Sequence, residues 1–202
     1  MNLALRHGVG FLLLACLGGL LPACYGPNTG NAEASGEPVF LLDLSGRRIE
    51  PLEQSEAAAT VFLFLRTDCP ISNRYAPEIR RLHDRFVPSG VEFWMIYPDP
   101  DEPLPAIRQH LADFEYPGRA ARDPEHALVE KTQATVTPEA AVFAEGELAY
   151  LGRIDNRYVD FGKTRAAATT HDLADALVAI LEGRPVPEPR TTAVGCFISD
   201  LK

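Results

Sequence analysis

The chain is poor in several features that would point directly to a function. Its 202 residues include 4 cysteines, 2 methionines and 1 tryptophan. Four cysteines are too few for a small scaffold held together by disulfides. Acidic residues outnumber basic ones by 28 to 19 without a basic stretch, so nucleic acid is not an expected partner. Zinc-ligand spacing, a Ser-His-Asp signature and a paired-carboxylate motif are also missing, and we expect neither a metal nor a cofactor.

The bulk composition is that of a packed globular protein. Hydrophobic residues make up 46% of the chain and charged residues 23%, which excludes disorder as the main state. The positions of the four cysteines are the most informative feature, and they are listed here: Cys16, Cys24, Cys69 and Cys196.

Residues 1–23 are typical of an export signal. A start containing Arg6 precedes an uncharged apolar run of about 14 residues, shorter than the roughly 20 that a membrane-spanning helix needs. The run ends in Leu21-Pro22-Ala23-Cys24, which resembles the bacterial lipobox. This resemblance implies a lipid on Cys24 and anchoring in the bacterial cell envelope, on the periplasmic side. The alternatives are a similar match ending at Cys16, plain secretion, and a buried N-terminal helix.

The rest of the chain divides into three parts. Residues 24–37 contain Gly, Pro, Asn and Ser with little apolar content and predict a flexible tether. Residues 38–183 predict one domain in which strands and helices alternate. Residues 184–202 form a Pro-rich tail that carries Cys196.

Hydrophobic patterns predict an α/β sandwich with one mixed sheet. A hairpin over residues 39–49 is followed by a buried strand over Thr60–Leu65. Apolar residues then recur at steps of three and four, which predicts a helix that Asp68 caps and Pro77 kinks. The other expected elements are strands over residues 91–97, 120–122, 140–143 and 148–154, helices over 104–114, 125–133 and 170–182, and an exposed loop over 98–105.

Two segments resemble the two halves of the thioredoxin-superfamily active site. Residues 64–77 place Cys69 at the start of a helix, eight residues before a proline, and residues 136–147 place Pro138 where that family has a cis-proline. With the N-terminal hairpin and a strand–helix insertion, the chain resembles the redoxin branch, which includes alkyl hydroperoxide reductase/thiol-specific antioxidant proteins and exported thiol oxidoreductases. The resemblance covers residues 37–183. It implies a thioredoxin-like fold, in which helices flank a mixed central β-sheet.

The same resemblance implies that Cys69 is the nucleophile and that Pro138 shapes the substrate groove. A helix N-terminus stabilises a thiolate, and Arg66 or Arg74 would add positive charge, whereas Asp68 would oppose it. The implied reaction is thiol–disulfide exchange or peroxide reduction. Its partners would be a thiol or disulfide protein, or a small thiol as electron donor, and a peroxide in the second case. Either reaction requires a solvent-accessible sulfur that faces Pro138.

Two departures from the family pattern matter. Ser72 stands where dithiol oxidoreductases have their second cysteine, and Phe62 and Arg66 stand where the peroxidatic pattern has Pro and Thr or Ser. Cys69 therefore has no resolving thiol one helical turn away. An extended tail reaches about 43 Å, enough to return along the last helix. We hypothesise that Cys196 docks through its apolar neighbours Val194, Phe197 and Ile198 and pairs with Cys69; the alternative is that it stays free or binds a partner.

Other interpretations remain open at this point. Arg66 and Arg157 are weak candidates for orienting a substrate, and both would otherwise form surface ion pairs. Cys69 could also be an inert core residue of a non-catalytic binding module. A copper-handling protein similar to the Sco family would instead use Cys69, Cys196 and His171. The remaining histidines of interest are expected to be surface or capping residues: His83, His110 and His126.

Overall fold

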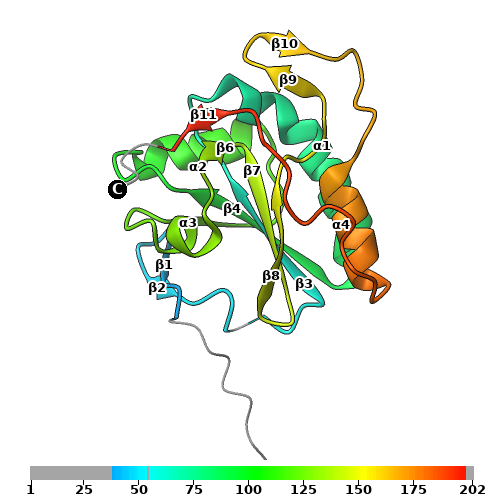
Figure 1. The fold of residues 1–202 in the computed structure, drawn as a ribbon. Coiled ribbons are helices and arrows are strands. Elements are labelled where there is room, and N and C mark those ends of the chain that lie inside the picture. Colours follow the sequence, from blue (N-terminus) through cyan, green and yellow to red (C-terminus); the bar gives the residue numbers. More distant parts are fainter. Residues whose placement is uncertain (1–37, 54, 199–202) are drawn as a thin grey trace, which may run out of the picture. The chain divides into compact units, whose positions relative to one another are not determined.

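The computed structural model describes residues 38–53 and 55–198, all within the unit Gly36–Lys202. Its main feature is a seven-stranded mixed sheet (Figure 1). In sheet order its strands are β2 (Arg48–Ile49), β1 (Leu41–Asp43), β5 (Arg119–Arg122), β4 (Val91–Tyr97), β3 (Ala59–Phe64), β7 (Glu139–Ala144) and β8 (Glu147–Gly152). The three central strands β5, β4 and β3 run parallel, whereas β1, β2, β7 and β8 join by antiparallel pairing.

Helices cover both faces of this sheet, as Figure 1 shows. They are α1 (Pro70–Phe86), which continues into a short 3-10 turn (Val87–Ser89), α2 (Leu104–Asp113), α3 (Ala127–Thr132) and α4 (Asp172–Leu181). Helices α1 and α4 share one hydrophobic core with the sheet, and α3 packs into a second core on the opposite face. Two short antiparallel ribbons complete the fold: β9 (Tyr158–Asp160) with β10 (Lys163–Thr164), and β6 (Val136–Thr137) with β11 (Cys196–Phe197).

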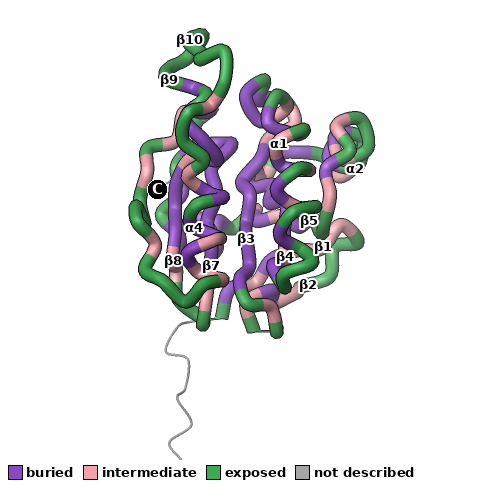
Figure 2. Tube along the Cα trace, turned by 90° about the vertical axis from the view of Figure 1, so that its right-hand side faces the viewer, coloured by how far each residue is buried: buried purple, intermediate pink, exposed green. Residues whose placement is uncertain are grey.

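The central strand β3 supplies side chains to both cores. Val61 and Leu63 belong to the core under α1 and α4, and Phe62 and Phe64 belong to the core under α3. Successive side chains of a strand point to opposite faces, so a strand covered on both faces must be apolar throughout. Figure 2 shows the result, with buried central strands enclosed by exposed loops and helix surfaces.

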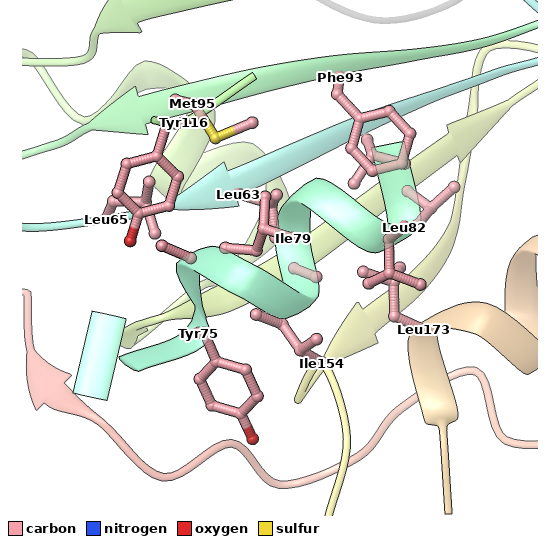
Figure 3. Packing of buried hydrophobic residues seen from close by; sticks show 14 of the residues in the cluster. Leu63, Leu65, Tyr75, Ile79, Leu82, Phe93, Met95, Tyr116, Ile154 and Leu173 are labelled. Atoms are coloured by element: carbon pink, nitrogen blue, oxygen red, sulfur yellow. The ribbon is translucent and has the colours of Figure 1, made fainter. Parts of the chain in front are cut away.

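Helix α1 is held against the sheet by one apolar stripe. Ile79 and Leu82 are both 0% exposed, and they lie among Leu63 of β3 and Leu173 of α4 (Figure 3). The three- and four-residue spacing of this stripe is what a helix needs to bury one face. Its packing fixes the position of the first turn of α1, where Cys69 lies.

The structure confirms the expected mixed sheet with flanking helices, but it contradicts two local expectations. Asp68 does not cap α1: the N-cap residue is Cys69 without a side-chain cap, and Asp68 instead pairs with Arg66 at 3.1 Å. The loop over residues 98–105 is not simply exposed, because Pro98 and Glu102 are buried in it.

The predicted signal, the tether and Cys24 lie outside the described residues. In the part of the chain that the structure does describe, no helix has both the length and the apolar character needed to cross a membrane.

Candidate active site

Cys69 lies at the junction between the sheet and the helix that the sequence predicted. It occupies the N-cap position of α1, with extended backbone angles (φ −83°, ψ 110°), and Pro70 is the first helical residue. Proline is well tolerated at that position because the first helical N–H has no partner within the helix. The Cys69 thiol donates a hydrogen bond to the Thr137 carbonyl oxygen at 3.1 Å.

The second half of the site is the Thr137–Pro138 peptide, which is cis. It joins the short strand β6 to the buried strand β7. Because the Thr137 carbonyl accepts the Cys69 hydrogen bond, the two segments that the sequence singled out, 68 residues apart in the chain, meet in space.

The C-terminal tail completes the site. After α4 the chain returns along β8, where the Leu151 N–H donates to the Pro189 carbonyl at 2.9 Å and the Thr191 N–H donates to the Leu151 carbonyl at 3.1 Å. The tail then forms β11, which pairs antiparallel with β6 so that Cys196 lies opposite Thr137 (Figure 1). The tail therefore returns to the site beside β8, where Val194 and Ile198 pack against the domain, but Phe197 is exposed and does not dock as expected.

This course brings the two described cysteines together. The Sγ atoms of Cys69 and Cys196 lie 2.8 Å apart, and both residues are free thiols in this structure. A disulfide needs about 2.05 Å between its sulfurs. The two thiols are thus in direct contact, and an oxidant that takes up two electrons and two protons would join their sulfurs as a disulfide.

The expectation that Cys69 is accessible to solvent is wrong. Cys69 is 0% exposed, whereas Cys196 is partly exposed. The sulfur of Cys69 faces the Thr137 carbonyl on one side and the Cys196 thiol on another. The Cys196 thiol is therefore one of the groups in contact with the buried sulfur.

The surroundings of the two sulfurs shift their pKa values in opposite directions. Burial by itself raises the pKa of Cys69, but hydrogen bonds from the Cys196 thiol and from the Ser72 backbone outweigh it and the net pKa is lowered. For Cys196, burial, the hydrogen bond with Cys69 and the negative charges of Cys69 and Asp68 raise the pKa to about 12, and the opposing charge of Arg66 offsets them only in part. When the pair loses one proton, the negative charge therefore resides on Cys69.

Ser72 lies in the first turn of α1 and is fully buried. Among the described residues its Oγ atom has no hydrogen-bond partner. A buried hydroxyl without a partner is costly, and this one contributes to lowering the Cys69 pKa when the sulfur is ionised. Ser72 can therefore stabilise a thiolate, but it cannot supply the missing second thiol.

Two buried polar residues near the site were not identified from the sequence. Glu102 accepts a hydrogen bond from the Thr67 N–H at 2.5 Å, and burial raises the pKa of its carboxyl group although that bond opposes the shift. His110 is 4% exposed and lies 2.8 Å from the Tyr97 hydroxyl and 2.7 Å from Asn73 Oδ1. Burial lowers the His110 pKa to about 4, so the ring is neutral.

Hydrogen bonds with these residues hold the loop that leads into Cys69 in place. Asn73 in turn donates to the Thr67 carbonyl at 3.3 Å, so Thr67 is held through both its N–H and its carbonyl group. The expectation that His110 is a surface or capping residue is therefore wrong. Its only sequence signal was its place on the apolar side of a short helix, and Glu102 was concealed in a loop rich in proline and acid.

The two arginine candidates are placed differently. Arg66 is held by Asp68 at 3.1 Å and by Asp99 at 3.5 Å. Arg157 is exposed, and its backbone N–H donates to Asp155 Oδ1 at 2.9 Å. Arg66 adjoins the loop before Cys69, but its charge is already paired with carboxylates.

The copper-binding set of two cysteines and His171 is not assembled in the described part of the chain. His171 instead lies beside Glu78 and Asp155, with one ligand atom from each within 4.8 Å of the others. Those carboxylates already have partners, since Asp155 accepts the Tyr75 hydroxyl at 2.6 Å and Glu78 pairs with Arg81.

Comparisons with known proteins agree with this architecture. No protein-family model and no curated protein matches the chain. Among solved structures, an uncharacterized conserved protein from Geobacillus kaustophilus is 26% identical, with a TM-score of 0.70 over 80% of this chain and 88% of its own. A hypothetical protein from Sinorhizobium meliloti is 21% identical, with a TM-score of 0.69 over 80% and 90%.

A third structure carries a functional description of its own. It is a secreted Mycobacterium tuberculosis disulfide oxidoreductase homologous to Escherichia coli DsbE, 16% identical, with a TM-score of 0.51 over 69% of this chain and 94% of its own. Together with a likeness to a thioredoxin-like protein from Aeropyrum pernix, this shows that the fold is thioredoxin-like.

Proposed function

We propose that the protein is an exported thiol–disulfide oxidoreductase in which Cys69 and Cys196 alternate between a dithiol and a disulfide. The observation that carries this proposal is the 2.8 Å separation of the two sulfurs beside the cis Thr137–Pro138 peptide. Two residues 127 positions apart reach this distance only because the tail returns to the site. The description of the structurally similar M. tuberculosis protein as a secreted disulfide oxidoreductase supports the same class of reaction.

Each residue of the site has a defined role in the proposal. One of the two cysteines forms a mixed disulfide with the partner, and the thiolate of the other attacks it, closes the intramolecular disulfide and releases the partner's sulfur as a thiolate. Cys69, whose pKa is lowered, is the nucleophilic thiolate of the pair, and Cys196 supplies the second thiol that is absent at Ser72. The Ser72 hydroxyl stabilises the Cys69 thiolate, and the Thr137 carbonyl next to Pro138 orients the Cys69 thiol.

Peroxide reduction is the less favoured use of the same sulfur. Arg66 is the nearest candidate cation along the chain, but two carboxylates already hold it. The burial of Cys69 also restricts the approach of a peroxide. An antioxidant role would require the tail to open.

The proposed location rests on the N-terminal sequence. A signal over residues 1–23 and a lipid on Cys24 would hold the domain at the membrane through the tether of residues 24–37. In a bacterial host, Cys24→Ser should move the protein from the membrane fraction to the soluble fraction, whereas Cys16→Ser should not.

The redox proposal is tested by the mass of the intact protein with and without a reductant. Oxidation should remove two hydrogen atoms, and peptide mapping should place the new bond between Cys69 and Cys196. Either Cys69→Ser or Cys196→Ser should abolish this change and reduce the catalysed reduction of a disulfide protein by dithiothreitol at least about 100-fold. Thr192→Ala, at an exposed tail residue, is the matched control. A wild-type protein that never forms this disulfide would refute the proposal.

A further inference from the structure

The two sulfurs differ in what a second molecule can reach. We infer that external thiols enter the reaction at Cys196 alone, and that Cys69 exchanges electrons only with Cys196 beneath the docked tail. This inference rests on the proposed function and reverses the expected roles, in which the cysteine at the helix start meets the partner. Its basis is that Cys69 is 0% exposed while Cys196 is partly exposed.

The tail is held firmly enough to keep Cys69 covered. The Thr191 hydroxyl lies 2.7 Å from the Tyr150 hydroxyl and accepts the Arg153 N–H at 3.1 Å. Beyond Cys196, Ile198 is 3% exposed in the core under α3, and its N–H donates to the Thr135 carbonyl at 3.0 Å. The cover over Cys69 is therefore fixed on both sides, by polar contacts before Cys196 and by a buried aliphatic side chain after it.

The outer surface beside Cys196 suits the approach of another protein. Phe197, the next residue, is 74% exposed. Successive side chains of a strand point to opposite faces, so Phe197 marks the solvent face of β11 while the Cys196 sulfur points towards Cys69. A partner with an apolar segment around its cysteine would cover Phe197 on its way to the sulfur. The inferred partner is therefore a protein thiol with apolar neighbours, which meets β11 from its solvent side.

The chemistry balances with an external thiol as the only co-reactant. Its thiolate attacks Cys196 Sγ of the oxidised protein, the bond to Cys69 Sγ breaks, and the bonding electron pair stays on Cys69. A second thiol of the partner then attacks the partner sulfur of this mixed disulfide and releases Cys196. The partner dithiol is oxidised to a disulfide, the protein disulfide is reduced, and the two thiol protons pass to the protein cysteines or to solvent.

In the first step the leaving group is the Cys69 thiolate, which leaves more readily than the Cys196 thiolate would. A thiol with a low pKa leaves faster in disulfide exchange, and the hydrogen bonds around Cys69 lower its pKa. The same stabilisation of the reduced pair favours the protein as an oxidant of its partner. Attack on Cys69 would instead expel Cys196, whose pKa is raised to about 12.

The first test locates the mixed disulfide. The oxidised full-length protein is mixed with a limiting amount of glutathione, quenched with acid, alkylated with N-ethylmaleimide and mapped by mass spectrometry. We expect glutathione on Cys196 and the maleimide on Cys69. Glutathione on Cys69 would overturn the inference and leave the proposed function intact. A protein that cannot be oxidised at all would overturn both.

The second test measures how well the docked tail shields Cys69 from a reagent in solution. In Cys196→Ser, the rate at which iodoacetamide modifies Cys69, read by peptide mapping, should be at least ten-fold below its rate in the unfolded protein. Adding Thr191→Ala should raise that rate several-fold, because the tail loses two hydrogen bonds. Adding Thr192→Ala, the same change at the exposed neighbour, should not alter it. Rapid modification of Cys69 with the tail intact would refute the inference.

Discussion

Cys69 and Cys196 carry the same functional group in two regions that are built in different ways. Cys69 sits between β3 and α1, where the core of the domain fixes its position. Cys196 sits on a two-residue strand of a tail that is attached mainly by backbone pairing to β6 and β8. One region provides a buried sulfur that favours the thiolate, and the other provides a cysteine that is partly exposed.

The difference shows how a site can divide two requirements that conflict at a single residue. A thiolate is stabilised by fixed donors that face it, which demands enclosure, whereas exchange with a protein demands exposure. With Ser72 in place of a second thiol on α1, this chain places the partly exposed cysteine on a separate segment.

The largest difference should be in stability. Ile79→Ala in α1 and Ile198→Ala on the tail remove the same atoms from residues that are 0% and 3% exposed. We expect Ile79→Ala to lower the free energy of unfolding by about 2–5 kcal/mol, because it leaves a cavity in the core. Ile198→Ala should lower it by less than half as much, because a short terminal strand can relax into the cavity more than the core can. Urea denaturation measures both, and equal losses would contradict this difference between the core and the tail.

The next prediction concerns the close fit of the tail strand. A Cβ atom at Gly195 would overlap the Thr137 carbonyl. In a Cys196→Ser background, Gly195→Ala should therefore prevent docking of β11 and raise the modification rate of Cys69 about ten-fold or more. Gly183→Ala is the control: its positive φ of 64° makes the substitution costly, but nothing lies within 4 Å of its Cβ position. If both variants expose Cys69 equally, general destabilisation would be the cause rather than lost docking.

A smaller effect should appear in the acidity of Cys69. Serine at position 196 can still donate a hydrogen bond to the Cys69 sulfur, whereas alanine cannot. The pH at which the rate of Cys69 modification by iodoacetamide reaches half its maximum should be lower in Cys196→Ser than in Cys196→Ala. The reason is that a hydrogen-bond donor to the thiolate lowers the pKa of the thiol. The reverse order would show that burial by Cys196, and not hydrogen bonding, governs the sulfur.

The smallest effect should come from Glu102, which helps to hold the loop before Cys69 in place. The pKa of Glu102 is raised above its ordinary value of 4.5 by burial, so the unfolded chain loses this proton first as the pH rises. The control is Glu102→Gln, which keeps an oxygen for the Thr67 N–H. The free energy of unfolding of the wild type minus that of this variant should be constant below pH 4.5. Above pH 4.5 the difference should decline until the carboxyl group of the folded protein ionises. Thermal melts of both proteins across pH 4–8 measure this difference, and a gap that does not change with pH would contradict it.

The sequence predicted much of the fold because much of the fold is local. The run of Phe62, Leu63 and Phe64 predicts a strand buried on both faces, and the spacing of Ile79 and Leu82 predicts a helix with one buried stripe. The segment around Cys69 and the segment around Pro138 carried the resemblance to a thioredoxin-like site. If the chain also shares the strand order of that fold, these two segments must lie next to each other in space.

Other features depend on partners that are distant in the chain. Glu102 is buried because Thr67 faces it, and His110 is buried because Tyr97 and Asn73 lie on either side of it. The proline-rich acidic loop gives no local sign of the Glu102 contact, and the short helix that carries His110 gives no sign of the contacts with Tyr97 and Asn73. The expectation of an exposed loop failed because composition reports average solvation and not which single side chain turns inward.

By itself, the sequence determined the alternation of strands and helices, the placement of a cysteine at the start of a helix, and the absence of a second thiol one turn later. Only the tertiary structure decided that the tail follows β8, that Cys196 reaches Cys69, and that Cys69 is closed to solvent. The physical reason is that periodicity and helix-terminal preferences act over a few residues, whereas burial and the meeting of two sulfurs are set by packing between segments more than a hundred residues apart.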